Sequence, residues 1–175
     1  MEKTISLSTI APLRTLSHIR KNHAMEHATI HLLTEYMPNV SFSGYSLWKG
    51  YWILGKAELQ GVQKAAEMAL ARLKNGERKL AVHPGCGTNL AVTGLCTAAA
   101  AMLTTMLDSE DDSKISRFSA FTAAGIMGAT LGRPLGPKIQ QNLTTDANVK
   151  DLSIVSISCS TLHGTPLFFI ETVLD

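Results

Sequence analysis

The stretch GCGTNLAVTGLCTAAAAMLTTML, residues 85–107, decides the fold class because it contains no charged side chain. A second uncharged stretch runs from residue 118 to residue 132, and the polar sequence DSEDDSKISR lies between the two. A membrane-spanning helix needs about 20 mostly apolar residues, so the first stretch qualifies and the second is short without its flanks. The pattern predicts an apolar two-helix hairpin, residues 86–133, inserted into a single domain of residues 1–175. It favours a transmembrane hairpin over two helices buried in a soluble core.

The charge distribution indicates how such a hairpin would be oriented. Charged residues make up only 17% of the chain, below the roughly 25% of an average soluble domain. Residues 1–84 hold eleven Lys and Arg against six Asp and Glu, and cytoplasmic segments carry the excess of basic residues. We therefore expect a membrane location with the bulk of the chain on the cytoplasmic side. Membrane lipid is the expected partner, with a membrane protein as a second expectation.

The chain outside the hairpin combines helical and strand patterns. Residues 12–37 have the periodicity of a helix that ends at Pro38-Asn39, and residues 60–74 have that of a surface helix. Strand-like segments rich in β-branched and aromatic residues are 40–43, 51–56, 151–160 and 165–173, the last two joined by a turn at His163-Gly164. These patterns predict an α+β fold in which helices back a small mixed sheet. The net charge of +2 gives no basic field, which excludes a nucleic-acid partner.

The sequence HAMEH, residues 23–27, places chemistry on the first helix. His23 and His27 are four residues apart, so both imidazoles point the same way and can hold one metal ion. Glu26 completes an H-x-x-E-H string, in which the glutamate acts as general base for a metal-bound water. The alternative is that these histidines line a polar helix contact. His31 extends the series by one turn, and a supporting role suits it better than ligation.

A second cluster, HPGCGTN at residues 83–89, strengthens the metal interpretation. His83 and Cys86 have the spacing of half a zinc site, and together with His23 and His27 they would make four ligands for Zn²⁺ or another divalent transition metal. The backbone N–H groups at the start of the apolar helix would favour a thiolate there. The alternative is a tight turn in which Cys86 is only a small apolar side chain.

A metal-free chemistry could use the same atoms. Cys86 at a helix N-terminus, with His27 or His23 as its base, would be the dyad of a Cys–His hydrolase or acyltransferase. This third interpretation leaves the repeated histidines and Glu26 unexplained. The remaining histidines, His18 and His163, have no partner in the sequence and are expected at the surface or in a turn.

In combination and in order, three motifs make the chain similar to the YqhQ-type bacterial membrane proteins and their smaller relatives of unknown function. The motifs are HAMEH (23–27), HPGCGT (83–88) and GPKIQQNLTT (136–145). The resemblance implies a membrane-embedded protein with a metal centre, held by His23, His27, His83 and Cys86 with Glu26 beside them. This chain has fewer apolar segments than the larger relatives, and Ile139-Gln140 stands where they have Leu-Gln.

Two functions of different classes follow from this sequence. The first is a membrane-associated metal-binding protein that serves as a scaffold or assembly factor. The second is a zinc-dependent hydrolase at the cytoplasmic membrane face, with Glu26 as its catalytic base. An open coordination position occupied by water would favour the hydrolase, and a closed site with four protein ligands would favour the scaffold.

Overall fold

The computed structural model describes residues 7–107 and 113–175, and the side chains from residue 12 onward. The chain divides into two compact units. The first, called here the sheet unit, is made from residues 1–83 and 143–175, and the second, the helical unit, from residues 84–142. The unit inserted into the chain is thus longer than the segment 86–133 named from the sequence. Of the expected polar loop DSEDDSKISR, residues 108–112 lie outside the described residues.

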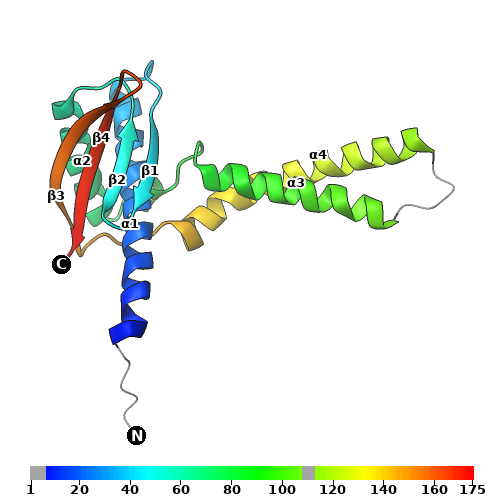
Figure 1. The fold of residues 1–175 in the computed structure, drawn as a ribbon, viewed down its shortest axis with the longest axis horizontal. Coiled ribbons are helices and arrows are strands. Elements are labelled where there is room, and N and C mark those ends of the chain that lie inside the picture. Colours follow the sequence, from blue (N-terminus) through cyan, green and yellow to red (C-terminus); the bar gives the residue numbers. More distant parts are fainter. Residues whose placement is uncertain (1–6, 108–112) are drawn as a thin grey trace, which may run out of the picture. The chain divides into compact units, whose positions relative to one another are not determined.

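The sheet unit contains four strands in the order β1-β2-β4-β3 (Figure 1). They are β1 (Ser43–Leu47), β2 (Gly50–Leu54), β3 (Leu152–Leu162) and β4 (Thr165–Leu174). The α+β class is confirmed, but the expectation of a mixed sheet is wrong because all three neighbouring pairs are antiparallel. Two-residue connections join β1 to β2 and β3 to β4, and such short connections permit only antiparallel pairing.

The predicted turn between β3 and β4 is confirmed at His163-Gly164. Both residues have positive φ, 49° at His163 and 79° at Gly164. Positive φ at both central residues defines a type I′ turn, whose twist matches that of the two strands it joins. Glycine adopts this conformation without steric cost, and histidine is one of the side chains that tolerate it.

Two helices cover one face of the sheet, α1 (Leu7–Tyr36) and α2 (Leu59–Lys74) (Figure 1). Alternate strand residues point towards them and form a core with no exposed area at Tyr51, Ile53, Phe168 and Ile170. The core residues contributed by the helices are Ala24, Met25, Ala28, Ile30, Leu32, Leu33, Val62, Ala65, Ala66, Ala69 and Leu73. A short 3₁₀ helix, Arg78–Ala81, follows α2 and also packs against α1.

The helical unit consists of α3 (Gly87–Leu107) and α4 (Lys114–Ile139), which pack antiparallel. Glycines allow this close approach: a Cβ at Gly128 would collide with the backbone of Cys96, and one at Gly136 would collide with Asn89. Residues later in α4 contact residues earlier in α3, which shows that the two helices run in opposite directions. Closely packed small residues are typical of helix pairs in membranes.

Among the described residues, only α3 is long and apolar enough to cross a membrane. The prediction of two spanning helices is therefore not confirmed for the second helix. The reason is length, because Arg117 and Arg133 confine the uncharged part of α4 to residues 118–132, which is shorter than the roughly 20 residues that a span requires.

Candidate metal centre

His23 and His27 lie on consecutive turns of α1, and their ring centroids are 4.3 Å apart. His23 is half-buried, whereas the side chain of His27 is buried, with only 2% of the residue exposed. The four-residue spacing places both rings on one side of the helix, as expected. This side faces the 3₁₀ helix and the segment around Thr144 rather than the apolar core.

Each of these two rings is held by a backbone carbonyl. His27 Nδ1 donates to the carbonyl oxygen of Ala81 at 2.8 Å, and His23 Nδ1 donates to that of Thr144 at 3.0 Å. A carbonyl can only accept, so the ring proton of each neutral imidazole resides on Nδ1. The lone pair is then on Nε2, in the tautomer and orientation typical of metal-binding histidines.

Two further histidines of the sheet unit extend the cluster. The His83 ring centroid lies 5.8 Å from that of His27 and 4.8 Å from that of His31. Burial of the ring, and after it the electrostatic influence of the neighbouring His31 and His27 rings, lowers the pKa of His83 to about 4. His83 is therefore a neutral imidazole at physiological pH. His31 uses its Nε2 to donate to the carbonyl of Val82 at 2.9 Å, and so braces the segment that carries His83.

Cys86 belongs to the helical unit and lies in the turn that precedes α3. The backbone N–H of Thr88 donates to its Sγ at 3.4 Å, and that of Asn89 donates to its carbonyl at 3.0 Å. These bonds are the helix N-terminal environment expected to stabilise a thiolate. Only two residues separate Cys86 from His83, which limits the distance between their Cα atoms to about 11 Å.

Glu26, also on α1, contacts the sheet. The residue is only 6% exposed, and its carboxylate accepts a hydrogen bond from the hydroxyl of Ser46 on β1. The absence of a side chain at Gly44 makes room for it, because a Cβ there would fall 2.6 Å from its Oε1. The carboxylate thus contacts the sheet, a location that the H-x-x-E-H pattern does not reveal.

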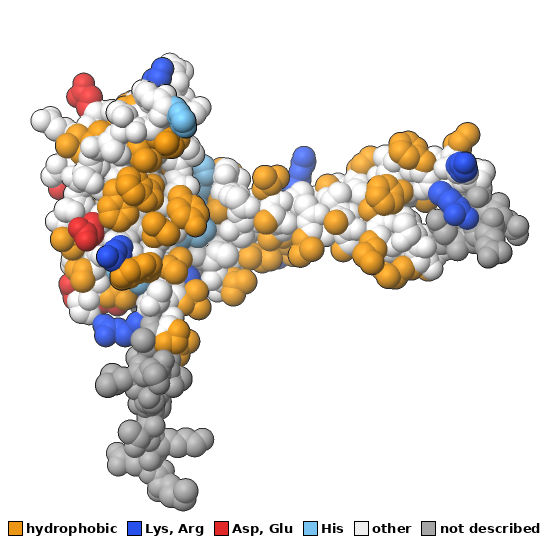
Figure 2. All heavy atoms as spheres, in the orientation of Figure 1, with side chains coloured by type: hydrophobic (Ala, Val, Ile, Leu, Met, Phe, Trp, Pro, Cys, Tyr) orange, Lys and Arg blue, Asp and Glu red, His pale blue; other side chains and the backbone are white. Residues whose placement is uncertain are grey.

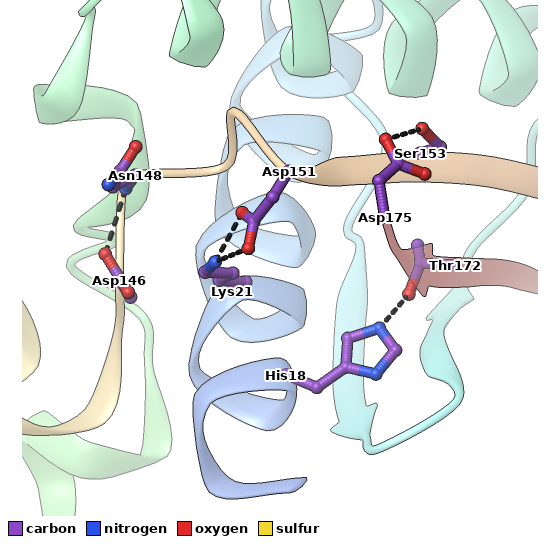
Figure 3. A network of polar contacts seen from close by, with 8 residues as sticks. All are labelled: His18, Lys21, Asp146, Asn148, Asp151, Ser153, Thr172 and Asp175. Atoms are coloured by element: carbon purple, nitrogen blue, oxygen red, sulfur yellow. Dashed lines mark hydrogen bonds and ion pairs between the residues drawn. The ribbon is translucent and has the colours of Figure 1, made fainter. Parts of the chain in front are cut away.

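Polar contacts join the preceding turns of α1 to β4 and to the turn before β3 (Figure 3). Lys21 forms an ion pair with Asp151, and His18 Nε2 contacts Thr172 Oγ1 at 2.9 Å. The Thr172 hydroxyl in turn donates to Asn22 Oδ1 at 2.6 Å, so it accepts from His18. His18, expected as an unpartnered surface histidine, has a structural contact that holds α1 in register with β4.

The segment LTTDAN, residues 143–148, contributes to the cluster through its backbone. Besides the Thr144 carbonyl on His23, the Thr145 carbonyl accepts from Arg20 Nη2 at 3.1 Å, and Asp146 N–H donates to the Arg20 carbonyl at 3.0 Å. The carbonyls of Ala81, Val82 and Thr144 were missed because every residue carries one, and no sequence pattern marks those that will orient a ring.

The comparisons with known proteins place this chain within a family. Residues 18–157 match the family described as a domain of unknown function, DUF6391. This chain belongs to the DUF6391 family. The matched range includes the histidines of α1, the segment around His83 and Cys86, and both helices of the helical unit.

A relative of this DUF6391 protein is an uncharacterised protein of Picosynechococcus sp. strain PCC 7002. The two are 35% identical over 175 residues, which cover 94% of this chain and 84% of the relative. No solved structure matches the chain. The expectation of a family of unknown function is confirmed, whereas none of these findings shows the resemblance to the YqhQ-type proteins, which stays an expectation.

Proposed function

We propose that this DUF6391 protein is a membrane-associated metal-binding protein. The ligands would be His23, His27, His83 and Cys86, and the ion Zn²⁺ or another divalent transition metal. The observation that carries the proposal is the pair of bonds from His23 Nδ1 and His27 Nδ1 to backbone carbonyls. Because each Nδ1 carries the ring proton, the Nε2 atom of each ring has the lone pair that a metal ion requires, and the two rings are neighbours on α1.

The chemistry of the ligand set supports a transition metal. Imidazole nitrogen and thiolate are the donors that zinc and similar borderline ions prefer, whereas magnesium and calcium prefer oxygen. His23, His27 and Cys86 would supply two nitrogens and one sulfur, and His83 a further nitrogen. The short chain between His83 and Cys86 supports their joint use, as in the paired ligands of structural zinc sites.

A structural or scaffolding use of the metal has better support than hydrolysis. General-base catalysis requires the Glu26 carboxylate to reach a metal-bound water. Its hydrogen bond from Ser46 and its burial against β1 favour a role in positioning α1. A hydrolase of the H-x-x-E-H type would have to release Glu26 from this contact, so we propose the scaffold or assembly factor.

The membrane association is proposed from α3. This helix contains no charged residue, and 6% of its most apolar window is buried in the structure. An exposed apolar surface of that length is stable in a bilayer and costly in water. The excess of basic residues in residues 1–84 supports a cytoplasmic location for the sheet unit.

The decisive experiment measures metal bound to purified full-length protein from metal-replete cells. We expect the wild type to carry a stoichiometric ion, His27→Ala to lose it and Glu26→Gln to keep it. His163→Asn is the matched control, because His163 lies in the β3–β4 turn and asparagine tolerates its positive φ. Metal-free wild type, or full retention by His27→Ala, would contradict the proposal.

Cobalt substitution tests the ligand set directly. Co²⁺ bound by a thiolate has a sulfur-to-metal charge-transfer band in the near ultraviolet, which should be present in the wild type and absent in Cys86→Ser. Cys159→Ser is the control, since Cys159 is an exposed thiol on β3. Membrane association is tested separately by extraction of membranes with alkaline carbonate, which should leave the protein in the pellet.

A further inference from the structure

The face of the sheet opposite α1 and α2 carries a row of three aromatic side chains, one on each of the neighbouring strands β1, β2 and β4. The strand register pairs Tyr45 with Trp52, and Trp52 with Phe169. Their sequence neighbours Ile53 and Phe168 point into the core with no exposed area, so the alternation of the strands turns the row outward. The Trp52 and Phe169 ring centroids are 4.6 Å apart, and Tyr45 is 66% exposed.

Further apolar and basic groups surround this aromatic row. At the tip of the β1–β2 hairpin, Trp48 is 52% exposed and the Lys49 ammonium lies 4.8 Å from its ring centroid. Leu47 on β1 and Val173 on β4 also expose much of their area, 36% and 44%. Figure 2 shows hydrophobic side chains gathered over the strands on this face, with a few charged groups between them.

The geometry points to a lipid surface as the occupant of this face. Resting on the proposed membrane association, we propose that Tyr45, Trp48, Trp52 and Phe169 insert at the boundary between headgroups and acyl chains. Tryptophan and tyrosine concentrate at this boundary because each joins an apolar ring to a polar N–H or O–H group. Lys49, beside Trp48, is complementary to lipid phosphate.

The connection between the sheet unit and α3 would keep this face close to a lipid surface. The first segment of the sheet unit ends at His83 and α3 begins at Gly87, so an α3 that spans a bilayer would tether the sheet unit to that bilayer's surface. Such a tether raises the effective concentration of lipid at the sheet, and weak insertion of a few rings then suffices for docking. The carboxylate of Glu171, on the same face, accepts from Ser156 Oγ at 2.9 Å and fits the polar margin of the surface.

The protein contains its own probes for the test. Its two tryptophans are Trp48 and Trp52, so tryptophan fluorescence reports on this face alone. Full-length protein would be reconstituted in vesicles of phosphatidylcholine and phosphatidylglycerol, with and without brominated acyl chains. We expect brominated lipid to remove most of the fluorescence and aqueous iodide to have little effect. Trp48→Phe and Trp52→Phe assign the quenching to each ring.

A pair of tyrosine variants separates docking from a purely structural role of the aromatic row. Tyr45→Ser should weaken quenching by brominated lipid, because Tyr45 is exposed on the docking face. Tyr36→Ser is the matched control, since Tyr36 is 59% exposed on α1, and should leave the quenching unchanged. Equal quenching in Tyr45→Ser, Tyr36→Ser and the wild type would overturn the inference.

Cysteine labelling distinguishes failure of this inference from failure of the membrane proposal. In the same vesicles, a water-soluble maleimide should label Cys159, which is exposed, and should not reach Cys96 in the middle of α3. Unquenched tryptophans that iodide reaches, with Cys96 protected, would overturn docking and leave the α3 span intact. Unquenched tryptophans shielded from iodide would overturn lipid docking in favour of a protein partner. Labelling of Cys96, with unquenched tryptophans, would overturn both.

Discussion

The sheet unit and the helical unit are both rich in apolar residues, but the sheet unit buries its large apolar side chains and the helical unit exposes many of its own. In the sheet unit, Ile53 and Phe168 have no exposed area. In the helical unit, Leu95, Met106 and Phe118 expose 71%, 68% and 71% of theirs. The sheet unit therefore builds its own apolar interior, whereas the helical unit leaves large apolar side chains on its surface.

The two units also differ in how their elements contact each other. Large side chains from α1, α2 and the sheet interdigitate in the sheet unit. The close packing of α4 against α3 requires glycine, because a Cβ at Gly128, Gly132 or Gly136 would come within 3.0 Å of atoms of α3. Burial of apolar area stabilises the first arrangement, and close backbone packing, which needs no water to drive it, stabilises the second.

The largest expected effect tests this difference in burial. Phe168→Ala should lower the free energy of unfolding of the sheet unit by about 3 to 5 kcal/mol, because it leaves a cavity in the core. Phe118→Ala, on the exposed surface of α4, should change it by less than about 0.5 kcal/mol. Denaturant unfolding followed by the fluorescence of Trp48 and Trp52 measures the sheet unit. Similar losses in the two variants would remove the contrast between the units.

The second prediction concerns the contribution of the metal to the sheet unit. Zinc at about a hundred times its dissociation constant should raise the free energy of unfolding by about 2.7 kcal/mol, because it binds only the folded state. A chelator should reverse this gain in the wild type and in His163→Asn, and should have no effect on His27→Ala. The same tryptophan fluorescence provides the measurement. An equal response of His27→Ala to the chelator would exclude His27 as a ligand.

The third prediction tests the glycine packing of the helical unit. Gly128→Ala should cost about 1 to 3 kcal/mol, because its Cβ would collide with the Cys96 backbone and fall 2.8 Å from Ala100 Cβ. At Gly125 a Cβ would lie 3.7 Å from Thr97 Cγ2, an ordinary contact. Gly125→Ala should therefore be neutral or stabilising by up to about 1 kcal/mol through helix propensity. Thermal loss of helical circular dichroism in detergent compares the two, and an indifferent Gly128→Ala would refute the close packing.

The smallest effect is expected at the ion pair of Lys21 and Asp151 (Figure 3). The Lys21 side chain is 8% exposed and that of Asp151 is 48% exposed, so solvent screens the pair. Asp151→Asn should cost about 0.2 to 1 kcal/mol at neutral pH. Glu77→Gln, which breaks the more exposed pair with Arg72, should cost less.

The pH dependence of this ion pair has a defined sign. The hydrogen bond from Lys21 holds the pKa of Asp151 below its ordinary value. The stabilisation is therefore present above the unfolded-state pKa of about 3.9 and is lost as pH falls through the lower folded-state pKa. Unfolding curves of the wild type and Asp151→Asn should converge in acid. A difference that persists well below pH 3 would assign the effect to something other than this charge.

Part of the candidate site follows from local periodicity. The four-residue spacing of His23 and His27 predicts their common side of α1, and the structure places their rings 4.3 Å apart. Helical spacing does not predict which residues the Glu26 carboxylate contacts. The contact of its carboxylate with β1 depends on Ser46 and Gly44, which the fold brings to α1 from about twenty residues further along the chain.

The sequence by itself determined the helix that carries the histidines, the uncharged segment that forms α3 and the turn at His163-Gly164. Each depends on side chains close together in the chain, whose spacing and conformational preferences act locally. Only the tertiary structure decided the direction of the strand pairs and the proton positions on His23 and His27. These depend on backbone groups such as the carbonyls of Ala81 and Thr144, which are chemically alike in every residue and differ only in where folding places them.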